Sequence, residues 1–177
     1  MSKHHGLVCA FRRGSALAGV TAALLFAAQA RAEEKEPAAV FEIGGAGEWS
    51  LGGGSSFGPV AAVEVTAVKN WLEVEVGVAS LFSRGQTEWD TNFIFKKPFD
   101  LSSTVEIEPG IGPALIHTTV AGRTMNSAAG QITLDFHFWP SPARTFGWFL
   151  EPSYSYDFGK GHEQSLGVSV GLLVAVP

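Results

Sequence analysis

The chain has 177 residues and a formal net charge of −5, with 46% hydrophobic and only 16% charged residues. A net acidic chain without clusters of lysine and arginine is a poor candidate for binding nucleic acid. The single cysteine, Cys9, lies near the N-terminus, so the rest of the chain has no disulfide or thiol chemistry.

The first 32 residues have the pattern of a secretory signal peptide. Basic residues precede an apolar stretch over residues 17–28, and Ala30-Arg31-Ala32 forms a small-x-small cleavage site. An N-terminal membrane anchor is the alternative, but the apolar stretch is shorter than the roughly 20 residues of a spanning helix. We therefore predict a cleaved signal peptide over 1–32, a short segment over 33–38 and one domain over 39–177.

Eight segments of this domain alternate apolar and polar residues with a period of two, which indicates β-strands with two unlike faces. They cover residues 39–50, 57–68, 71–82, 86–97, 101–118, 127–139, 145–158 and 163–176. The last segment is the clearest, because Leu166, Val168 and Val170 begin a wholly aliphatic face. The first is the weakest, because glycines interrupt it.

The connections between these segments alternate along the chain. Tight turns are expected at residues 69–70, 97–100 and 141–143, and the other connections at 52–56, 83–85, 119–126 and 159–162. An even number of strands places both chain ends on one side, the periplasmic side of an outer-membrane barrel. Proline cannot donate to a ladder, so bulges or strand ends are expected at Pro59, Pro109, Pro113 and Pro152.

Alternation alone fits either a membrane barrel with its apolar face outside or a soluble barrel of lipocalin or avidin type with an apolar interior. Aromatic residues near the strand ends favour the membrane, since they resemble two interfacial girdles. The predicted girdle contains Trp49, Trp71, Phe82, Trp89, Phe95, Trp139, Trp148 and Tyr156. We therefore predict an all-β, eight-stranded, antiparallel, up-and-down transmembrane β-barrel in the outer membrane.

The sequence resembles the small OmpA-like and opacity-type outer-membrane barrel domains. The most local shared element is a proline followed by glycine or an aromatic residue, as in Glu108-Pro109-Gly110 and Glu151-Pro152-Ser153-Tyr154. The resemblance implies a non-enzymatic protein with a structural or envelope role, minor passive permeability at most, and no cofactor. Its partners would be membrane lipids and the barrel-assembly machinery. That machinery commonly reads a terminal aromatic residue, whereas this chain ends in Val176-Pro177.

On this assignment of faces the interior is strongly acidic. Its predicted members are Glu64, Glu73, Glu75, Glu106, Glu108, Asp135, His137 and Glu151, with Lys96 as the basic partner and Arg144 near the rim. An eight-stranded barrel is just wide enough to be filled by side chains, and unpaired buried charge is costly. Either water enters, some carboxyl groups are protonated, or cations bind. A hydrated ionic plug is the favoured interpretation, and a cation site or narrow cation pathway is the alternative.

No catalytic residue or metal site is predicted. His137 lacks the second histidine expected of a zinc site. His117 lies on the lipid-directed face and is similar in place to the histidine of eight-stranded lipid A deacylases. Those enzymes use a His-Ser pair, whereas this chain has Thr118 and Thr119. A lipid A-modifying enzyme and a soluble periplasmic ligand-binding barrel are therefore the alternative functions.

Overall fold

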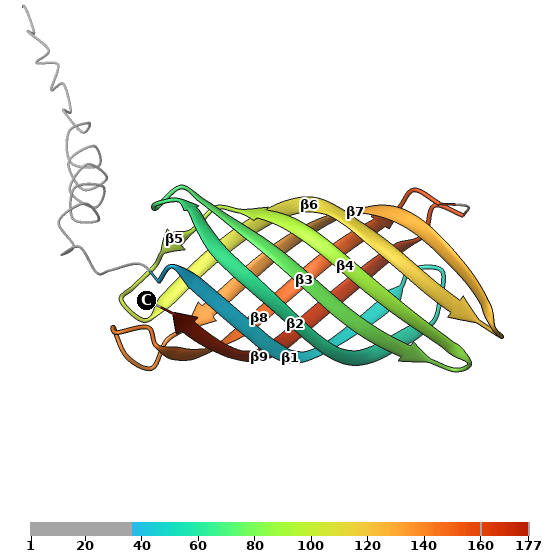
Figure 1. Cartoon of the computed structure of the whole chain (residues 1–177), viewed down its shortest axis with the longest axis horizontal. Coiled ribbons are helices and arrows are strands. Elements are labelled where there is room, and N and C mark those ends of the chain that lie inside the picture. The colour runs from blue at the N-terminus through green and yellow to red at the C-terminus, as the bar shows by residue number, and fades with distance from the viewer. Residues whose placement is uncertain (1–36, 160, 177) are drawn as a thin grey trace, which may run out of the picture. The chain divides into compact units, whose positions relative to one another are not determined.

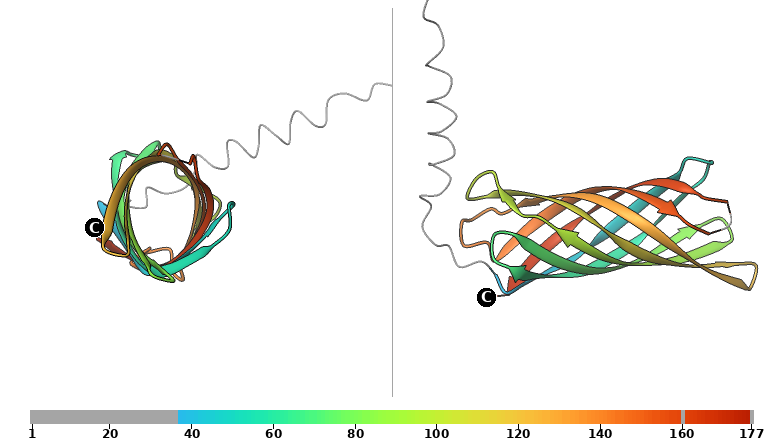
Figure 2. Two further views of the ribbon diagram at one scale, coloured as in Figure 1. Left: turned by 90° about the vertical axis from the view of Figure 1, so that its right-hand side faces the viewer. Right: turned by 90° about the horizontal axis from the view of Figure 1, so that it is seen from above.

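A computed structural model describes residues 37–159 and 161–176, which form one closed antiparallel sheet (Figures 1 and 2). The predicted signal peptide lies outside the described residues. The strands are β1 Ala39–Ser50, β2 Ser55–Val68, β3 Leu72–Ser83, β4 Gln86–Lys96, β5 Phe99–Asp100, β6 Val105–Val120, β7 Arg123–Phe138, β8 Phe146–Asp157 and β9 Gln164–Val176. No helix long and apolar enough to cross a membrane occurs within this part of the chain.

Eight long strands close the barrel wall, and the ninth, β5, is a two-residue addition beside β6. Neighbouring strands pair in chain order, and β1 also pairs with β9, with Ala39 opposite Val176. Each wall strand therefore has two partners, and the sheet has no free edge. The predicted eight-stranded antiparallel barrel is confirmed. Below, the chain-end side of the barrel is the one where β1 begins and β9 ends.

Two predicted boundaries are wrong. The segment predicted as one strand over 101–118 begins with a turn, in which the backbone N–H groups of Leu101 and Ser102 both donate to the carbonyl of Val105. The connection predicted over 119–126 is only two residues long. Ala121 and Gly122 both have positive φ, at 48° and 76°, so β6 and β7 join through a tight hairpin turn.

The prolines lie inside strands rather than at bulges. Pro59 pairs with Gly45 of β1, and on its other side the ladder to β3 skips two positions without a change of register. Pro113 and Pro152 show the same arrangement. A missing N–H removes one bond on one side only, so the strand stays extended. A shift of register between β2 and β3 lies elsewhere, between Thr66 and Val68.

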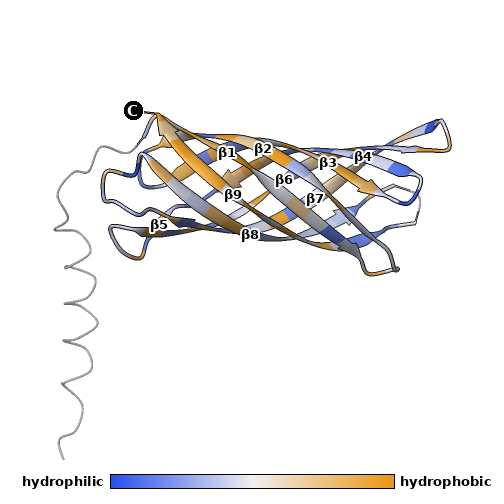
Figure 3. Cartoon of the chain, turned by 90° about the horizontal axis from the view of Figure 1, so that it is seen from below, coloured by the Kyte–Doolittle hydropathy of each residue, from blue (hydrophilic) through white to orange (hydrophobic). Residues whose placement is uncertain are grey.

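The two faces of the wall differ in polarity. Large apolar side chains such as Ile43, Ile111 and Val170 point outward and are exposed, whereas the buried charged side chains point inward. Hydrophobic residues make up much of the wall, and hydrophilic residues are more frequent on the hairpins away from the chain-end side (Figure 3). A small apolar cluster also lies inside the barrel, made of Val40, Trp139, Phe149, Leu173 and Ala175.

Candidate functional site

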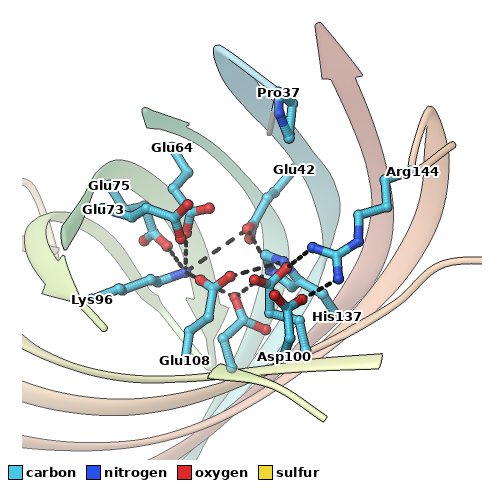
Figure 4. A network of polar contacts seen from close by, with 12 residues as sticks. Pro37, Glu42, Glu64, Glu73, Glu75, Lys96, Asp100, Glu108, His137 and Arg144 are labelled. Atoms are coloured by element: carbon cyan, nitrogen blue, oxygen red, sulfur yellow. Dashed lines mark hydrogen bonds and ion pairs between the residues drawn. The ribbon is translucent and has the colours of Figure 1, made fainter. Parts of the chain in front are cut away.

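Lys96 is the centre of a group of buried charges inside the chain-end side of the barrel (Figure 4). Its Nζ lies 2.8 Å from Asp135 Oδ2 and 3.0 Å from Glu64 Oε2, and it also contacts Glu75. Three further carboxylates have an oxygen 3.9 Å from Nζ, those of Glu42, Glu108 and Glu151. We call these six acids the carboxylate cage. An ammonium has three protons to donate, so Lys96 cannot donate to all six acids at once.

Strand register brings the cage together. Inward positions of adjacent strands lie opposite one another, and this sets Glu64 against Glu75 and Glu108 against Asp135. Like charges directly opposite each other in a sheet are destabilising. Lys96, at the end of β4, lies opposite Glu73 and extends its side chain into the cage. The wall strands therefore assemble an arrangement that needs a positive charge at its centre.

His137 is a second buried group held between carboxylates. Its Nε2 lies 3.0 Å from Asp135 Oδ2 and 3.4 Å from Glu42 Oε1, while Nδ1 lies 3.3 Å from Glu108 Oε1. A neutral imidazole donates from one nitrogen only, whereas an imidazolium donates from both. Because both nitrogens face carboxylate oxygens, the geometry suits the imidazolium.

Arg144 pairs with two further acids near the rim of the barrel. Its Nη1 lies 3.0 Å from Glu106 Oε2, and Nη2 contacts Asp100 of the short strand β5. On the same side, Thr66 Oγ1 donates to Glu73 Oε1 at 3.2 Å. The two-residue strand β5 thus positions a carboxylate that helps to hold Arg144 over the acidic interior.

Negative charge is in excess in this region of the described structure. The buried acids are Glu42, Glu64, Glu73, Glu75, Glu106, Glu108, Asp135 and Glu151. Against these eight stand three cationic groups, Lys96, His137 and Arg144, so the acids exceed them by five even when His137 carries a charge. Uncompensated buried charge is costly, so the interior must hold further protons, water or cations.

Several sets of three side chains are close enough to share a metal ion. Donor atoms of Glu106, Glu108 and His137 lie within 4.8 Å of one another. So do those of Glu42, Glu75 and Asp135, but Lys96 Nζ lies among these three. Each set has at most one histidine, which does not match the donor set of a zinc centre.

All nine predicted interior residues lie inside the barrel, and none is more than 8% exposed. One cage member, Glu42 of β1, is absent from the predicted set. Its signal is present in the sequence, because Glu42 alternates with the outward residues Phe41 and Ile43. The glycines that follow made this strand the least regular of the eight.

The predicted aromatic girdle contains one error. Trp49, Trp71, Phe82, Trp89, Phe95 and Trp148 are on the outside with 44% to 61% of their surface exposed, and Tyr156 is half-buried. Trp139 is wrong, because it is 2% exposed and packs inside with Phe149 and Leu173. It follows Asp135 and His137 at spacings of two, which places it on their inward face.

His117 lies on the outside and its Nδ1 is 2.6 Å from Asn126 Oδ1. Thr118, the next residue, points the other way and donates from Oγ1 to Glu88 at 3.2 Å. The structure thus sets an amide, not a hydroxyl nucleophile, beside the imidazole.

No protein-family model and no curated protein matches this sequence. Among solved structures, the barrel is similar to Neisserial surface protein A (NspA), with a TM-score of 0.62 and 16% identity over 77% of this chain and 95% of that one. It is also similar to Ail, the attachment invasion locus protein of Yersinia pestis, with a TM-score of 0.53 and 13% identity over 78% and 98% of the two chains. The chain has the fold of small outer-membrane β-barrels.

A second structure of Ail, in complex with the heparin analogue sucrose octasulfate, gives a TM-score of 0.53 and 13% identity over 77% and 96% of the two chains. The resemblance to OmpA-like and opacity-type barrels is thereby confirmed at the level of the fold. At these identities the role of the protein has to be argued from its own residues.

Proposed function

We propose that the protein is an outer-membrane β-barrel with a structural role in the cell envelope and no catalytic activity. The observation that carries the proposal is the polarity of the wall, which has large apolar side chains outside and charged ones inside. A soluble ligand-binding barrel needs the opposite arrangement, because its outside faces water. A continuous apolar exterior is stable in a bilayer, where a closed barrel also satisfies every backbone polar group.

The proposal includes export through a signal peptide over residues 1–32. The barrel-assembly machinery would then insert the chain into the outer membrane. The chain-end side would face the periplasm, as in barrels with an even number of strands. The exposed aromatic residues would then contact lipid at the two interfaces, and membrane lipids would be the main partners. Nucleic acid is not a partner on this proposal.

We expect at most minor passive permeability, because side chains fill the barrel interior. The carboxylate cage and Lys96 fill the chain-end side, and Phe149, Ile94 and Leu173 are also almost completely buried. An eight-stranded barrel has little room left once such side chains occupy it. Single-channel recording in planar bilayers should show no large, stable conductance, and the appearance of one would contradict the closed interior.

Cell fractionation and gel migration test the membrane location. The full chain should be recovered in the outer-membrane fraction and should need detergent for extraction. Unheated samples should migrate differently from heated ones, because a folded barrel resists unfolding by detergent at room temperature. Recovery in the soluble periplasmic fraction without detergent would instead establish the soluble barrel.

The lipid A-modifying alternative has its own test. Mass spectra of lipid A from cells with and without the protein should be identical. Loss of an acyl chain only in the expressing cells, abolished by His117→Ala, would overturn the non-enzymatic proposal.

A further inference from the structure

An apolar groove of about 350 Å³ lies on the outside of the wall, on the chain-end side, where β4 pairs with both β3 and β6. Its lining includes Trp71, Phe95, Pro109 and Ile111, and Lys97 lines it at the rim. Its volume lies at the lower end of the range for small-molecule sites, about 300–1,000 Å³. We propose that the groove holds one acyl chain of an anionic phospholipid whose phosphate binds Lys97. The inference rests on the proposed location in the outer membrane.

The size of the outward side chains gives the groove its shape. Phe95 and Ile111 lie opposite each other on β4 and β6, Trp71 comes just before β3, and all three are exposed. Pro109 is the next outward residue of β6 toward the rim and has only a compact ring, so the wall is lower there. Within a bilayer an apolar surface gains nothing by contacting one lipid tail rather than another. The shape therefore fixes where a chain lies, and the charges at the rim decide which lipid it belongs to.

The charges beside the groove are positive. Lys97 Nζ donates to the backbone carbonyl of Asn70 and lies 5.2 Å from the ring centroid of Phe99. An ammonium has three protons, so donation to one carbonyl leaves protons for phosphate oxygens. Lys69, the residue before Asn70, is also exposed in this turn. No carboxylate lines the groove as the structure describes it, and Asp100, the acid nearest to Lys97 along the chain, contacts Arg144. Basic residues without acids beside them favour an anionic head group.

Polarity changes along the groove in the same order as along a phospholipid. Lys97 follows the end of β4 at the rim, whereas Ile111 lies further from the rim, because β6 begins on the chain-end side at Val105. Trp71, with 61% of its surface exposed, lies beside the turn, where an indole suits the level of the head groups. The chain-end side would face the periplasm, so the lipid would belong to the periplasmic leaflet.

Native mass spectrometry of the folded protein in detergent micelles tests the site. The protein is titrated with phosphatidylglycerol or with phosphatidylcholine that carries the same acyl chains. The wild type should retain one phosphatidylglycerol per barrel, with an affinity at least about fivefold higher than for phosphatidylcholine, because a basic residue near anionic lipid contributes about that factor. Lys97→Gln should remove this preference. Pro109→Phe adds a ring within the groove and should weaken the binding of both lipids.

Each variant has a matched control. Arg123→Gln also removes one exposed positive charge, but at the start of β7, on the opposite end of the barrel. Val174→Phe also adds a ring to an outward position on the chain-end side, but on β9, away from the groove. Both controls should bind phosphatidylglycerol within about twofold of the wild type, since a distant charge is screened. Heat-modifiable gel migration shows which variants are folded before the titration.

The proposal fails if the folded wild type retains no lipid, or retains both phospholipids equally. It also fails if Lys97→Gln and Pro109→Phe bind phosphatidylglycerol as the wild type does, or if lipid A, the lipid of the opposite leaflet, is retained more tightly. Such results from a protein recovered in the outer-membrane fraction would leave its membrane location intact. Recovery in the soluble periplasmic fraction would instead overturn the location and the lipid site together.

Discussion

At the scale of single residues, Lys96 is the positive charge that compensates most of the buried carboxylates of the interior. Its Nζ has oxygens of six carboxylates within 3.9 Å. Burying an ion pair brings little net stability, because both partners lose their hydration. Removing one partner is a different matter, because the other is then left buried without compensation. The cage should therefore tolerate the loss of Lys96 poorly.

Lys96→Met tests this directly. The variant keeps a long side chain but leaves Glu64, Glu75 and Asp135 without their nearest cation. We expect the free energy of unfolding to fall by about 3–5 kcal/mol. Urea unfolding of the barrel in lipid vesicles measures it.

Lys97→Met is the control for that variant. Lys97 is adjacent in sequence but only half-buried, and its Nζ donates to the backbone carbonyl of Asn70 at the surface. Its loss should change the free energy of unfolding by less than about 1 kcal/mol. Equal unfolding midpoints for the two variants would contradict the role assigned to the ammonium of Lys96.

The residue scale also shows what the sequence can predict about the interior. Alternation places each acid on the inward face, because side chains along a strand point to opposite sides. It does not predict which acids meet Lys96, since that depends on how strands far apart in the chain are registered. Trp139 shows a further limit, because its aromatic character suggested the interface while its spacing from His137 places it inside.

At the scale of the strands, Gly112 allows β4 and β6 to approach closely. A Cβ at this position would lie 1.9 Å from the carbonyl oxygen of Phe93 on the facing strand. A backbone atom cannot move aside as a flexible side chain does, so any larger residue must push the two strands apart. Gly112 is therefore a packing requirement of the wall.

Gly112→Ala should lower the free energy of unfolding of the barrel by about 1–3 kcal/mol, which is the usual cost of overpacking. The fraction of protein that refolds into vesicles, read from heat-modifiable gel migration, should fall. Gly45→Ala is the matched control, because its Cβ would meet only the carbonyl oxygen of Gly58 at 3.8 Å. Equal refolding of both variants would show that β4 and β6 accommodate the methyl group.

The strands differ in how well their limits can be predicted. β1 occupies residues 39–50 as predicted in spite of its glycines, because the outward residues Phe41, Ile43 and Trp49 keep the period of two. The connection between β6 and β7 is shorter than predicted for a chemical reason. Its positive-φ positions hold Ala121 and Gly122 rather than the Asn-Gly pair that marks such turns in a sequence.

At the scale of the whole molecule, the apolar exterior predicts a dependence of stability on depth in the membrane. Val170 lies in the middle of β9 with 52% of its surface exposed, and Leu166 lies near the start of the same strand with 50% exposed. Both are outward apolar residues, so exposure alone does not distinguish them. Their distance from the centre of a bilayer would.

Val170→Lys should lower the free energy of unfolding in vesicles by about 2–4 kcal/mol, and Leu166→Lys by about 0–1 kcal/mol. The difference arises because a lysine near the interface keeps its ammonium hydrated. Comparable effects of the two substitutions in urea titrations would count against a bilayer around the middle of the wall.

The pairing of β1 with β9 makes the order of the strands a cycle, since Ala39 lies opposite Val176 just as it lies opposite Val65. A short covalent linker between the ends of these two strands would leave every ladder intact. Opening the chain instead at the turn of Asn70, on the same side of the barrel, would give a circular permutant that begins with β3. The wall does not distinguish a first strand from a last one, so such a permutant should close into the same barrel around the same charges.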